Sequence, residues 1–413
     1  MRASSVRAAS AALLALALLA SPSRASIEEF QSFDALRQEE DDENLLDRVL
    51  VRHPEAWRDE WERAPNAFRT TEGCFTSGQW YIVHDLQLRT PLGKQSHMDL
   101  QLRQVQDTES VYEWLQFEFR FPVLGTGLWG VRFRPDFDKS RQDLALLWDH
   151  GDATTPLQVQ AAFTIEDTFN KLWAFRQTRV GDQSEPYEVH PLEPALRVVW
   201  RHDHGRIEAS GTWLTPSRKR FEMFDPALRR REELWGVKHA LSIEQSFGDW
   251  RAEARFDQVQ VSSNVRYELL GGSGHSFRRR SLGEVALRRR LGSRARVETR
   301  WFWQDRTQDW LPPLSNSSFH ATDRMPTIEF GYAPRTDLVA RIGYMLDHVS
   351  VENHGTVPGF NWGTRRESRL FVGLQARFGR VRIQGIEGVE LDREAYPVTL
   401  HHDKGFLGLQ TTF

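Results

Sequence analysis

The stretch WGVKHALSIEQSF, residues 235–247, alternates between two kinds of side chain. Its apolar members are Trp235, Val237, Leu241, Ile243 and Phe247, and its polar members are Lys238, Ser242, Glu244 and Ser246. Successive side chains of a strand point to opposite faces, so the pattern predicts a strand with one apolar and one polar face. Strands of soluble proteins average about 5–6 residues, so this one is unusually long.

The same alternation recurs along the chain from about Gly78. We count about 16 to 19 such segments, of roughly 9 to 15 residues each, which is the length a strand needs to cross a membrane at a tilt. One example sets Phe117, Phe119, Phe121 and Val123 against Gln116, Glu118 and Arg120. Tight turns are expected at 248–249, 292–293, 333–336 and Gly379, and longer loops at 264–276, 306–324, 352–366 and 392–404. Short turns alternating with long loops are typical of outer-membrane barrels.

The N-terminus indicates export. Residues 1–25 combine Arg2 and Arg7, an apolar run over residues 11–20, and small residues Ser23 and Ala25 at the spacing of a signal-peptidase site. Cys74 is the single cysteine, which excludes intrachain disulfides and sites built from several thiolates. The net charge of -3 gives no support to nucleic-acid binding.

Residues 26–76 differ from the rest of the chain. They are rich in charge, and Leu45, Leu46, Val49 and Leu50 recur at helical spacing before Pro54. We expect a short helical periplasmic segment here, which either plugs the barrel or docks a periplasmic protein partner through residues 27–72. Residues 77–413 are expected to form the barrel.

Taken together, the signal peptide, the alternating strands and the ending GFLGLQTTF at residues 405–413 resemble the Gram-negative outer-membrane β-barrel class, of the porin-like kind. The resemblance implies an all-β fold: a transmembrane, antiparallel, up-and-down β-barrel of about 16–18 strands. It also implies that Leu407, Leu409 and Phe413 form the signal read by the barrel-assembly machinery, and that outer-membrane lipid and lipopolysaccharide surround the protein.

Arginine dominates the polar face of the later strands. The candidate pore-lining residues are Arg288, Arg290, Arg294, Arg296, Arg300, Arg377, Arg380 and Arg382, with Glu284 and Glu298. A ring of guanidinium groups would favour anions. Alternatively, these arginines pair with Glu253, Asp257, Glu329 and Asp347 in a ladder that braces the barrel. Arg278 to Arg280, expected at the outer end of a strand, are candidates for binding lipopolysaccharide phosphates.

The sequence also contains residue types that occur in catalytic and metal sites. Three His/Asp clusters, at 149–152, 201–205 and 400–404, carry His150, His204 and His402 at expected turns. Such residues can bind a metal ion or activate water. No fixed motif joins them, and GGSGHSF at 271–277 places its Ser and His in an expected loop. We therefore predict no catalytic residue, no metal and no cofactor.

The predicted function is an outer-membrane channel, not an enzyme, that passes small polar or anionic solutes. One alternative is a barrel that serves as the sheath or exit port of an export or electron-conduit complex. A second alternative is a hydrolase at the barrel rim that uses the His/Asp clusters.

Overall fold

The computed structural model describes residues 66–412, apart from gaps at 75–79, 94–95, 108–110, 124–126, 136–141, 152–154, 166–174, 179–180, 185–186, 222–228, 270–271, 311–316, 355–362 and 392–403. The predicted signal peptide and the helical part of the N-terminal segment lie outside these residues. No helix in the described part of the chain is long and apolar enough to cross a membrane.

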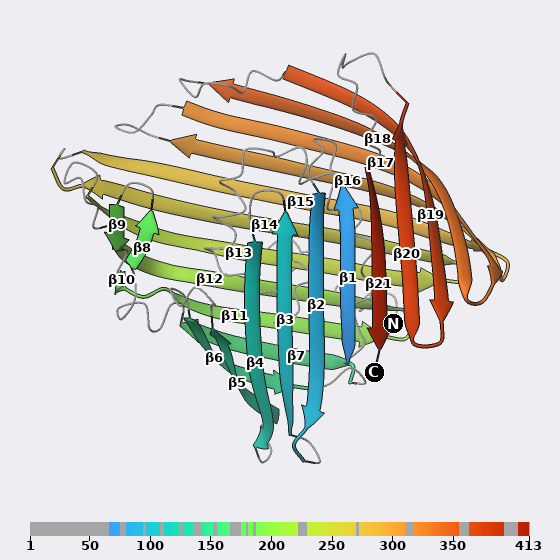
Figure 1. The fold of residues 1–413 in the computed structure, drawn as a ribbon, viewed down its shortest axis with the longest axis horizontal. Coiled ribbons are helices and arrows are strands. Elements are labelled where there is room, and N and C mark those ends of the chain that lie inside the picture. The colour runs from blue at the N-terminus through green and yellow to red at the C-terminus, as the bar shows by residue number, and fades with distance from the viewer. Residues whose placement is uncertain are drawn as a thin grey trace, which may run out of the picture.

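The described chain folds into one closed, antiparallel β-barrel (Figure 1). Strands β1 and β21 pair with each other, which joins the two ends of the sheet. Strands β10 and β11 both pair with β12, at different heights, and occupy one position in the wall. The barrel therefore has 18 strand positions. The predicted all-β barrel is confirmed, at the upper end of the predicted strand number.

The strands of the first half of the wall are shorter than strands β12 to β19 of the second half. The first half contains β1 (Ala67–Cys74), β2 (Trp80–Pro91), β3 (His97–Asp107), β4 (Val111–Val123), β5 (Gly127–Pro135), β6 (Gln142–His150), β7 (Leu157–Ile165), β10 (Tyr187–Val189) and β11 (Leu192–His202). The second half contains β12 (Gly205–Phe221), β13 (Arg230–Phe247), β14 (Trp250–Tyr267), β15 (Ser273–Leu291), β16 (Ala295–Trp310), β17 (Ser317–Arg335), β18 (Leu338–His354), β19 (Gly363–Phe378), β20 (Val381–Glu390) and β21 (Lys404–Thr412). A small separate hairpin consists of β8 (Phe175–Thr178) and β9 (Gly181–Ser184).

The first strand begins earlier than expected. Strand β1 starts at Ala67, inside the stretch assigned to the N-terminal segment, and pairs with β2 over its whole length. Its sequence, AFRTTEGC, contains few large apolar side chains and therefore lacks the clear alternation of the other strands. The chain enters β1 at the end of the barrel that carries the short turns, because Ala67 pairs with Thr412 and the Thr412 amide donates to the Arg380 carbonyl.

The connections follow the predicted alternation of short and long. Residues 248–249, 292–294, 336–337 and 379–380 are tight turns at one end of the barrel. Gly248, Gly292 and Gly379 have positive φ angles of 61°, 73° and 60°, a conformation that other residues adopt at a cost. The expected turn at 333–336 lies slightly later, because β17 continues to Arg335.

At the opposite end, the strands run further than the sequence indicated. Strand β15 begins at Ser273 and β16 continues to Trp310, so residues expected in loops are paired in the wall. In particular, most of GGSGHSF belongs to β15, where Ser276 pairs with Trp310. The flanking Gly and Ser residues favoured a loop, and tertiary pairing overrides that local preference.

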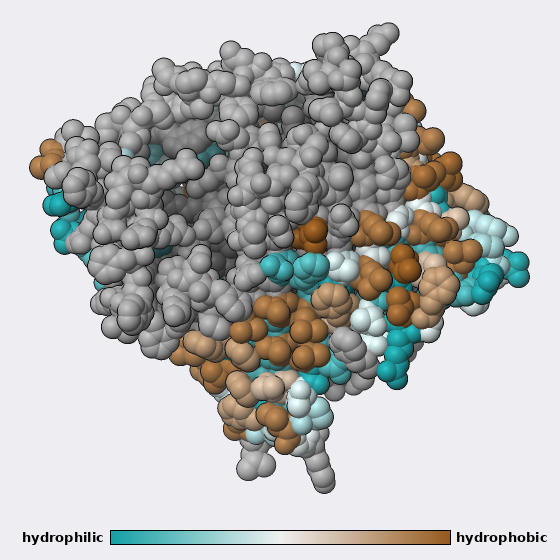
Figure 2. Space-filling view, in the orientation of Figure 1, coloured by the Kyte–Doolittle hydropathy of each residue, from teal (hydrophilic) through white to brown (hydrophobic). Residues whose placement is uncertain are grey.

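The two faces of the wall are inverted relative to a soluble protein. On β4, Phe119 and Phe121 are 43% and 42% exposed, whereas the alternating Gln116 and Glu118 are only 3% and 2% exposed. Figure 2 shows hydrophobic residues gathered on the outer surface of the described strands. Apolar side chains therefore face outward and polar side chains face the interior, which confirms the predicted alternation on this strand.

The final strand closes the barrel. Strand β21 pairs with β20 on one side and with β1 on the other. Leu407 faces outward and is 57% exposed, while Gln410, on the opposite face, is buried. Leu409 has the parity of Leu407 and is half-buried. Phe413 lies outside the described residues, and the role of these three residues in assembly stays a prediction.

Candidate functional site

The inner face of β15 and β16 brings together most of the charged residues that the sequence singled out. Glu284 and Arg288 have the inward parity of the buried Leu282 and Ala286 on β15. Arg296, Glu298 and Arg300 have the inward parity of the buried Phe302 and Gln304 on β16. Because the strands are antiparallel neighbours, these side chains form cross-strand pairs on one surface.

These residues form two groups of ion pairs, which meet where Glu298 lies opposite Glu329. The Glu298 carboxylate accepts from Arg288 Nε at 2.6 Å and from Arg300 Nη2 at 2.5 Å. Arg300 also pairs with Glu284, with 2.8 Å between Nη1 and Oε1. Glu298 is directly opposite Glu329 on β17, which pairs with Arg296 at 3.5 Å and with Arg341 of β18 at 3.9 Å. We call these seven residues the central ladder: Glu284, Arg288, Arg296, Glu298, Arg300, Glu329 and Arg341.

The central ladder agrees with the bracing interpretation of these arginines. Glu329 is one of the four partners that this interpretation named, whereas Glu253 and Asp257 pair with Arg251 and Arg255 of their own strand, β14. Glu298 and Arg341 are buried, so their charges are stabilised chiefly by their ion-pair partners: Arg288 and Arg300 for Glu298, and Glu329 for Arg341. The ladder nevertheless contains four arginines and three glutamates, and therefore retains a positive formal charge.

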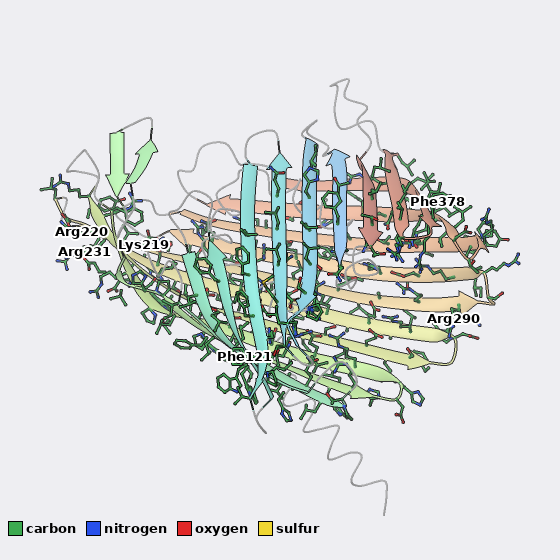
Figure 3. The ribbon with its side chains drawn as sticks, turned by 60° about the horizontal axis from the view of Figure 1, so that its bottom comes forward. Phe121, Lys219, Arg220, Arg231, Arg290 and Phe378 are labelled. Carbon is green, nitrogen blue, oxygen red and sulfur yellow. The ribbon has the colours of Figure 1, made fainter. Side chains whose placement is uncertain are left out.

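The other candidate arginines lie at the short-turn end of the barrel. Arg290, Arg294, Arg377 and Arg380 are all exposed. Arg290 has the inward parity of Arg288, and Arg377 Nε donates to the Gly379 carbonyl at 3.2 Å. Arg382 is half-buried and directly opposite Arg377. Figure 3 shows Arg290 at the opposite end of the long strands from Arg220 and Arg231. These arginines thus add positive charge at one mouth of the barrel.

The arginines at 278–280 do not form the outer cluster that we expected. Strand β15 continues past them to Ser273, so they lie within the wall instead of at its end. Arg278 and Arg280 have the inward parity of Leu282, and only Arg279 faces outward. The alternation of the strand therefore separates neighbours in sequence onto opposite faces.

A second group of buried ion pairs was not singled out from the sequence. On β4 to β6, Glu118 binds Arg132 at 2.9 Å and also Arg120, and Arg120 pairs with Asp149. On β11 and β12, Glu208 binds Arg197 at 2.7 Å and also Arg206. The alternation places each residue on the inner face, but the matching of charges across strands follows from the register, which the sequence does not reveal.

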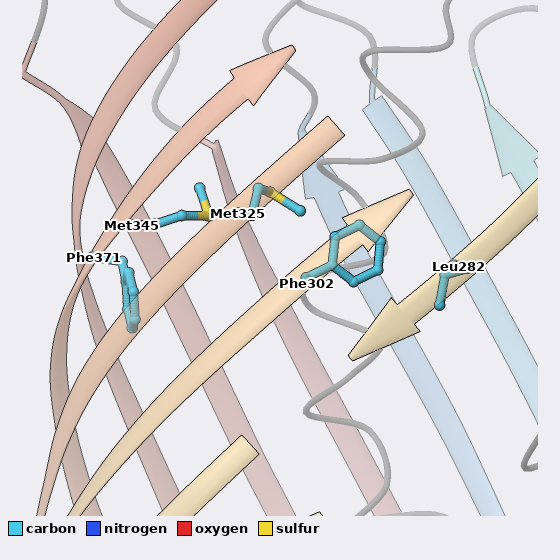
Figure 4. Packing of buried hydrophobic residues seen from close by; sticks show 5 residues of the cluster. All are labelled: Leu282, Phe302, Met325, Met345 and Phe371. Atoms are coloured by element: carbon cyan, nitrogen blue, oxygen red, sulfur yellow. The ribbon is translucent and has the colours of Figure 1, made fainter. Parts of the chain in front are cut away.

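The inner face also contains an apolar belt that the sequence did not indicate. Its members are Leu282, Phe302, Met325, Met345 and Phe371, one from each of the strands β15 to β19, and all are buried (Figure 4). The belt adjoins the central ladder, since Glu284 pairs directly with Phe302. Phe371 lies over Gly343, where a Cβ atom would be 2.1 Å from the Phe371 ring. Gly343 and Phe371 are a glycine and an aromatic residue directly opposite each other, a pairing in which the ring covers bare backbone. This pairing is the one feature that could have indicated the belt, and it becomes visible only once the register is known.

The described residues of the His/Asp clusters do not form a metal-binding group. His150 and His204 both lie at the short-turn end, where they are exposed, and Asp149 pairs with Arg120 on the inner face. The third cluster leads into Lys404, at the start of β21 and hence at the other end of the barrel; His402 lies outside the described residues. Within the described part of the chain, no group of three or more His, Cys, Asp or Glu residues could hold a metal ion.

No protein-family model matches this chain, and no curated protein sequence matches it. Solved structures with a similar arrangement include CdiB from Acinetobacter baumannii, at 12% identity and a TM-score of 0.42, over 84% of this chain and 60% of CdiB. They also include OccK2 (OpdF) of Pseudomonas aeruginosa, at 10% identity and a TM-score of 0.39, over 84% of this chain and 95% of OccK2. OmpT of Vibrio cholerae follows at 11% identity and a TM-score of 0.37, over 85% of this chain and 99% of OmpT. At these TM-scores the similarity carries no argument about function.

Proposed function

We propose that this protein is a channel of the bacterial outer membrane that passes small polar or anionic solutes. The observation that carries the proposal is the inversion of the two faces: charged side chains such as Glu118 and Arg132 line the interior, while phenylalanines face outward. An exposed apolar surface of this extent is stable in lipid and unfavourable in water. A closed barrel leaves no unpaired strand edge, which is the condition for a sheet to cross a membrane.

The preference for anions follows from the charges of the inner face. The central ladder has one arginine more than it has glutamates, and Arg290, Arg294, Arg377 and Arg380 add exposed charge at the short-turn mouth. Fixed positive charges in a pore attract anions and raise the barrier to cations. The paired arginines of the ladder contribute less to this field than the exposed arginines at the mouth, because their glutamate partners offset them.

The test is the current through the purified full-length protein in a planar bilayer under a gradient of potassium chloride. We expect open-channel conductance with a reversal potential on the anion-selective side. A variant with Arg290→Gln, Arg294→Gln, Arg377→Gln and Arg380→Gln should shift the reversal potential toward cations. Arg289→Gln is the matched control, because Arg289 neighbours Arg290 but stacks over Trp250 on the outer face.

Two results would contradict the proposal. A folded protein that gives no conductance would contradict the channel. An equal shift in the fourfold variant and in the Arg289→Gln control would contradict selectivity by the mouth arginines, since the control changes charge only on the outer face.

A second candidate is a barrel that serves as the sheath or exit port of a larger complex, with the N-terminal segment as its periplasmic dock. One observation favours it: the chain enters β1 at the short-turn end, where Asn66 Oδ1 accepts from the Arg89 amide at 2.6 Å. Short turns face the periplasm in outer-membrane barrels, so this end is the one a periplasmic partner would meet. Of residues 27–65, thirteen are Asp or Glu and five are Arg.

Deletion of residues 27–65 distinguishes a dock from a plug. A segment that plugs the barrel predicts a larger single-channel conductance after its deletion. A dock predicts the same conductance in the pure protein, together with loss of a stoichiometric partner from the complex isolated from membranes.

A further inference from the structure

Three outward-facing residues on neighbouring strands form one row. Arg324 on β17 is directly opposite His348 on β18, and His348 is directly opposite Arg366 on β19. All three are exposed. Figure 1 shows β17, β18 and β19 side by side in the wall. Neighbouring strands are about 4.8 Å apart, so the two guanidinium groups flank His348 within the reach of their side chains. We call Arg324, His348 and Arg366 the outer basic row.

With the long-connection end taken as the top of the barrel, the outer basic row lies at the upper boundary of the apolar outer surface. On β18, Leu338 begins the strand at the short-turn end, and Ile342 and Tyr344 are exposed apolar residues below His348. The ten residue-to-residue steps from Leu338 to His348 rise about 34 Å along the strand, or about 25 Å along the barrel axis at the usual tilt. That is the height of the lipid-facing band of such barrels. The row is therefore placed at the level of lipid headgroups.

The residues around the outer basic row suit a phosphate group. Directly above it, Thr322, Ser350 and Thr364 form a second row that carries a hydroxyl on each strand. Below it, Ile328, Tyr344 and Leu370 are exposed and in register, and present an apolar surface to acyl chains. Guanidinium groups bind phosphate through charge-assisted hydrogen bonds, and hydroxyl groups can donate further bonds.

The neighbouring carboxylates belong to other rows. Asp305 faces outward opposite Thr322, and Glu352 is opposite His320, one row higher than the hydroxyls. Arg279 shares that higher row, so its charge has a carboxylate at the same level. Among the described residues, no carboxylate lies in the register row of Arg324, His348 and Arg366.

We propose that the outer basic row binds the phosphate of a membrane lipid in the leaflet on the long-connection side of the barrel. The proposal rests on the membrane insertion stated above, and it names the lipid contact that residues 278–280 do not provide. The proposed ligand is a phosphate-bearing lipid and not free phosphate, because the apolar residues Ile328, Tyr344 and Leu370, two outward rows below, would contact its acyl chains. With short turns on the periplasmic side, this leaflet is the outer one.

Native mass spectrometry of the detergent-solubilised full chain tests this site. The probes are dioleoyl phosphatidate, which carries a terminal phosphate monoester, and dioleoyl phosphatidylcholine, whose phosphate is masked by choline. We expect Arg324→Gln/Arg366→Gln to bind phosphatidate at least about tenfold more weakly than the unaltered protein, since two charged donors are lost. Arg366→Gln alone should weaken binding by a smaller factor.

Arg289→Gln is the control matched to Arg366→Gln, because it also removes one arginine from the outer face, at the opposite boundary of the apolar surface. It should leave phosphatidate binding unchanged, and phosphatidylcholine should bind all variants alike. Unchanged phosphatidate binding by the folded double variant would overturn the proposal. Displacement of phosphatidate by inorganic phosphate would also overturn it, because the site would then take the free anion.

The bilayer conductance of the double variant should equal that of the unaltered protein, so that failure of the lipid site and failure of the channel are separate results.

Discussion

Replacement of Glu298 by Gln tests whether the central ladder holds the barrel wall together. Glu298 is the residue that links two arginines: Arg288 Nε is 2.6 Å from one carboxylate oxygen and Arg300 Nη2 is 2.5 Å from the other. The substitution keeps the shape of the side chain but removes its charge. Arg288 loses its carboxylate partner in the ladder, while Arg300 keeps Glu284 at 2.8 Å.

The expected cost follows from this asymmetry. Removal of one partner from a buried ion pair costs about 3–5 kcal/mol, because the remaining charge stays desolvated. Glu298 is buried, but Arg300 retains a carboxylate, and the like charge of Glu329 opposite Glu298 is relieved. We therefore expect a loss at the lower end, about 3 kcal/mol. Glu284→Gln should cost less, because Arg300 then keeps its bond to Glu298.

The assay is urea-induced unfolding of the protein in lipid vesicles, followed by tryptophan fluorescence. The exposed Glu352→Gln variant on the outer face is the control, expected to change stability by less than about 0.5 kcal/mol. A double-mutant cycle between Glu298→Gln and Arg288→Gln isolates the energy of their interaction. If Glu298→Gln costs less than about 1 kcal/mol, the pair behaves as a solvated surface pair and the bracing argument is refuted.

Three further changes probe the wall and its assembly. Deletion of Phe413 should block insertion by the assembly machinery, measured as loss of the folded, heat-modifiable band from outer-membrane fractions; normal insertion would count against the predicted signal. Gly343→Val should destabilise the barrel by about 1–3 kcal/mol in the same urea assay, because its Cβ would lie 2.1 Å from the Phe371 ring, and Phe371→Leu should recover part of the loss. Val285→Arg should cost about 2–4 kcal/mol in vesicles, because Val285 is exposed on the outer face near the middle of the apolar surface; an unaffected variant would show that lipid does not contact this position.

Much of the fold could be read from the alternation of side chains. The pattern at residues 235–247 and at Phe117 to Val123 shows which residues share the apolar face, and this assignment does not depend on where each strand ends. The strand limits were less accessible. Strand β1 and the upper parts of β15 and β16 lack a clear apolar face, and pairing with neighbouring strands stabilises them instead.

The candidate site could be predicted only in part, because its contacts also depend on how the strands pair. Alternation places Arg288 and Glu298 on the inner face, but it does not show that they meet, because contact between strands depends on register. The same limit applies to Arg278 and Arg279, which are adjacent in sequence and lie on opposite faces. The apolar belt around Phe302 and Met325 could not be predicted, because each strand contributes a single apolar residue to an otherwise polar face. The belt exists only when several strands lie side by side.

The period of two along single strands was enough to predict long β-strands and to sort their residues into an apolar and a polar face. The number of strand positions, the closing pair β1 and β21, and the partners of each charge are established only in the folded barrel. Those features depend on register and closure, which join residues distant in sequence through backbone hydrogen bonds that every residue can make. The outer basic row is one such product: Arg324, His348 and Arg366 become neighbours only when three strands align.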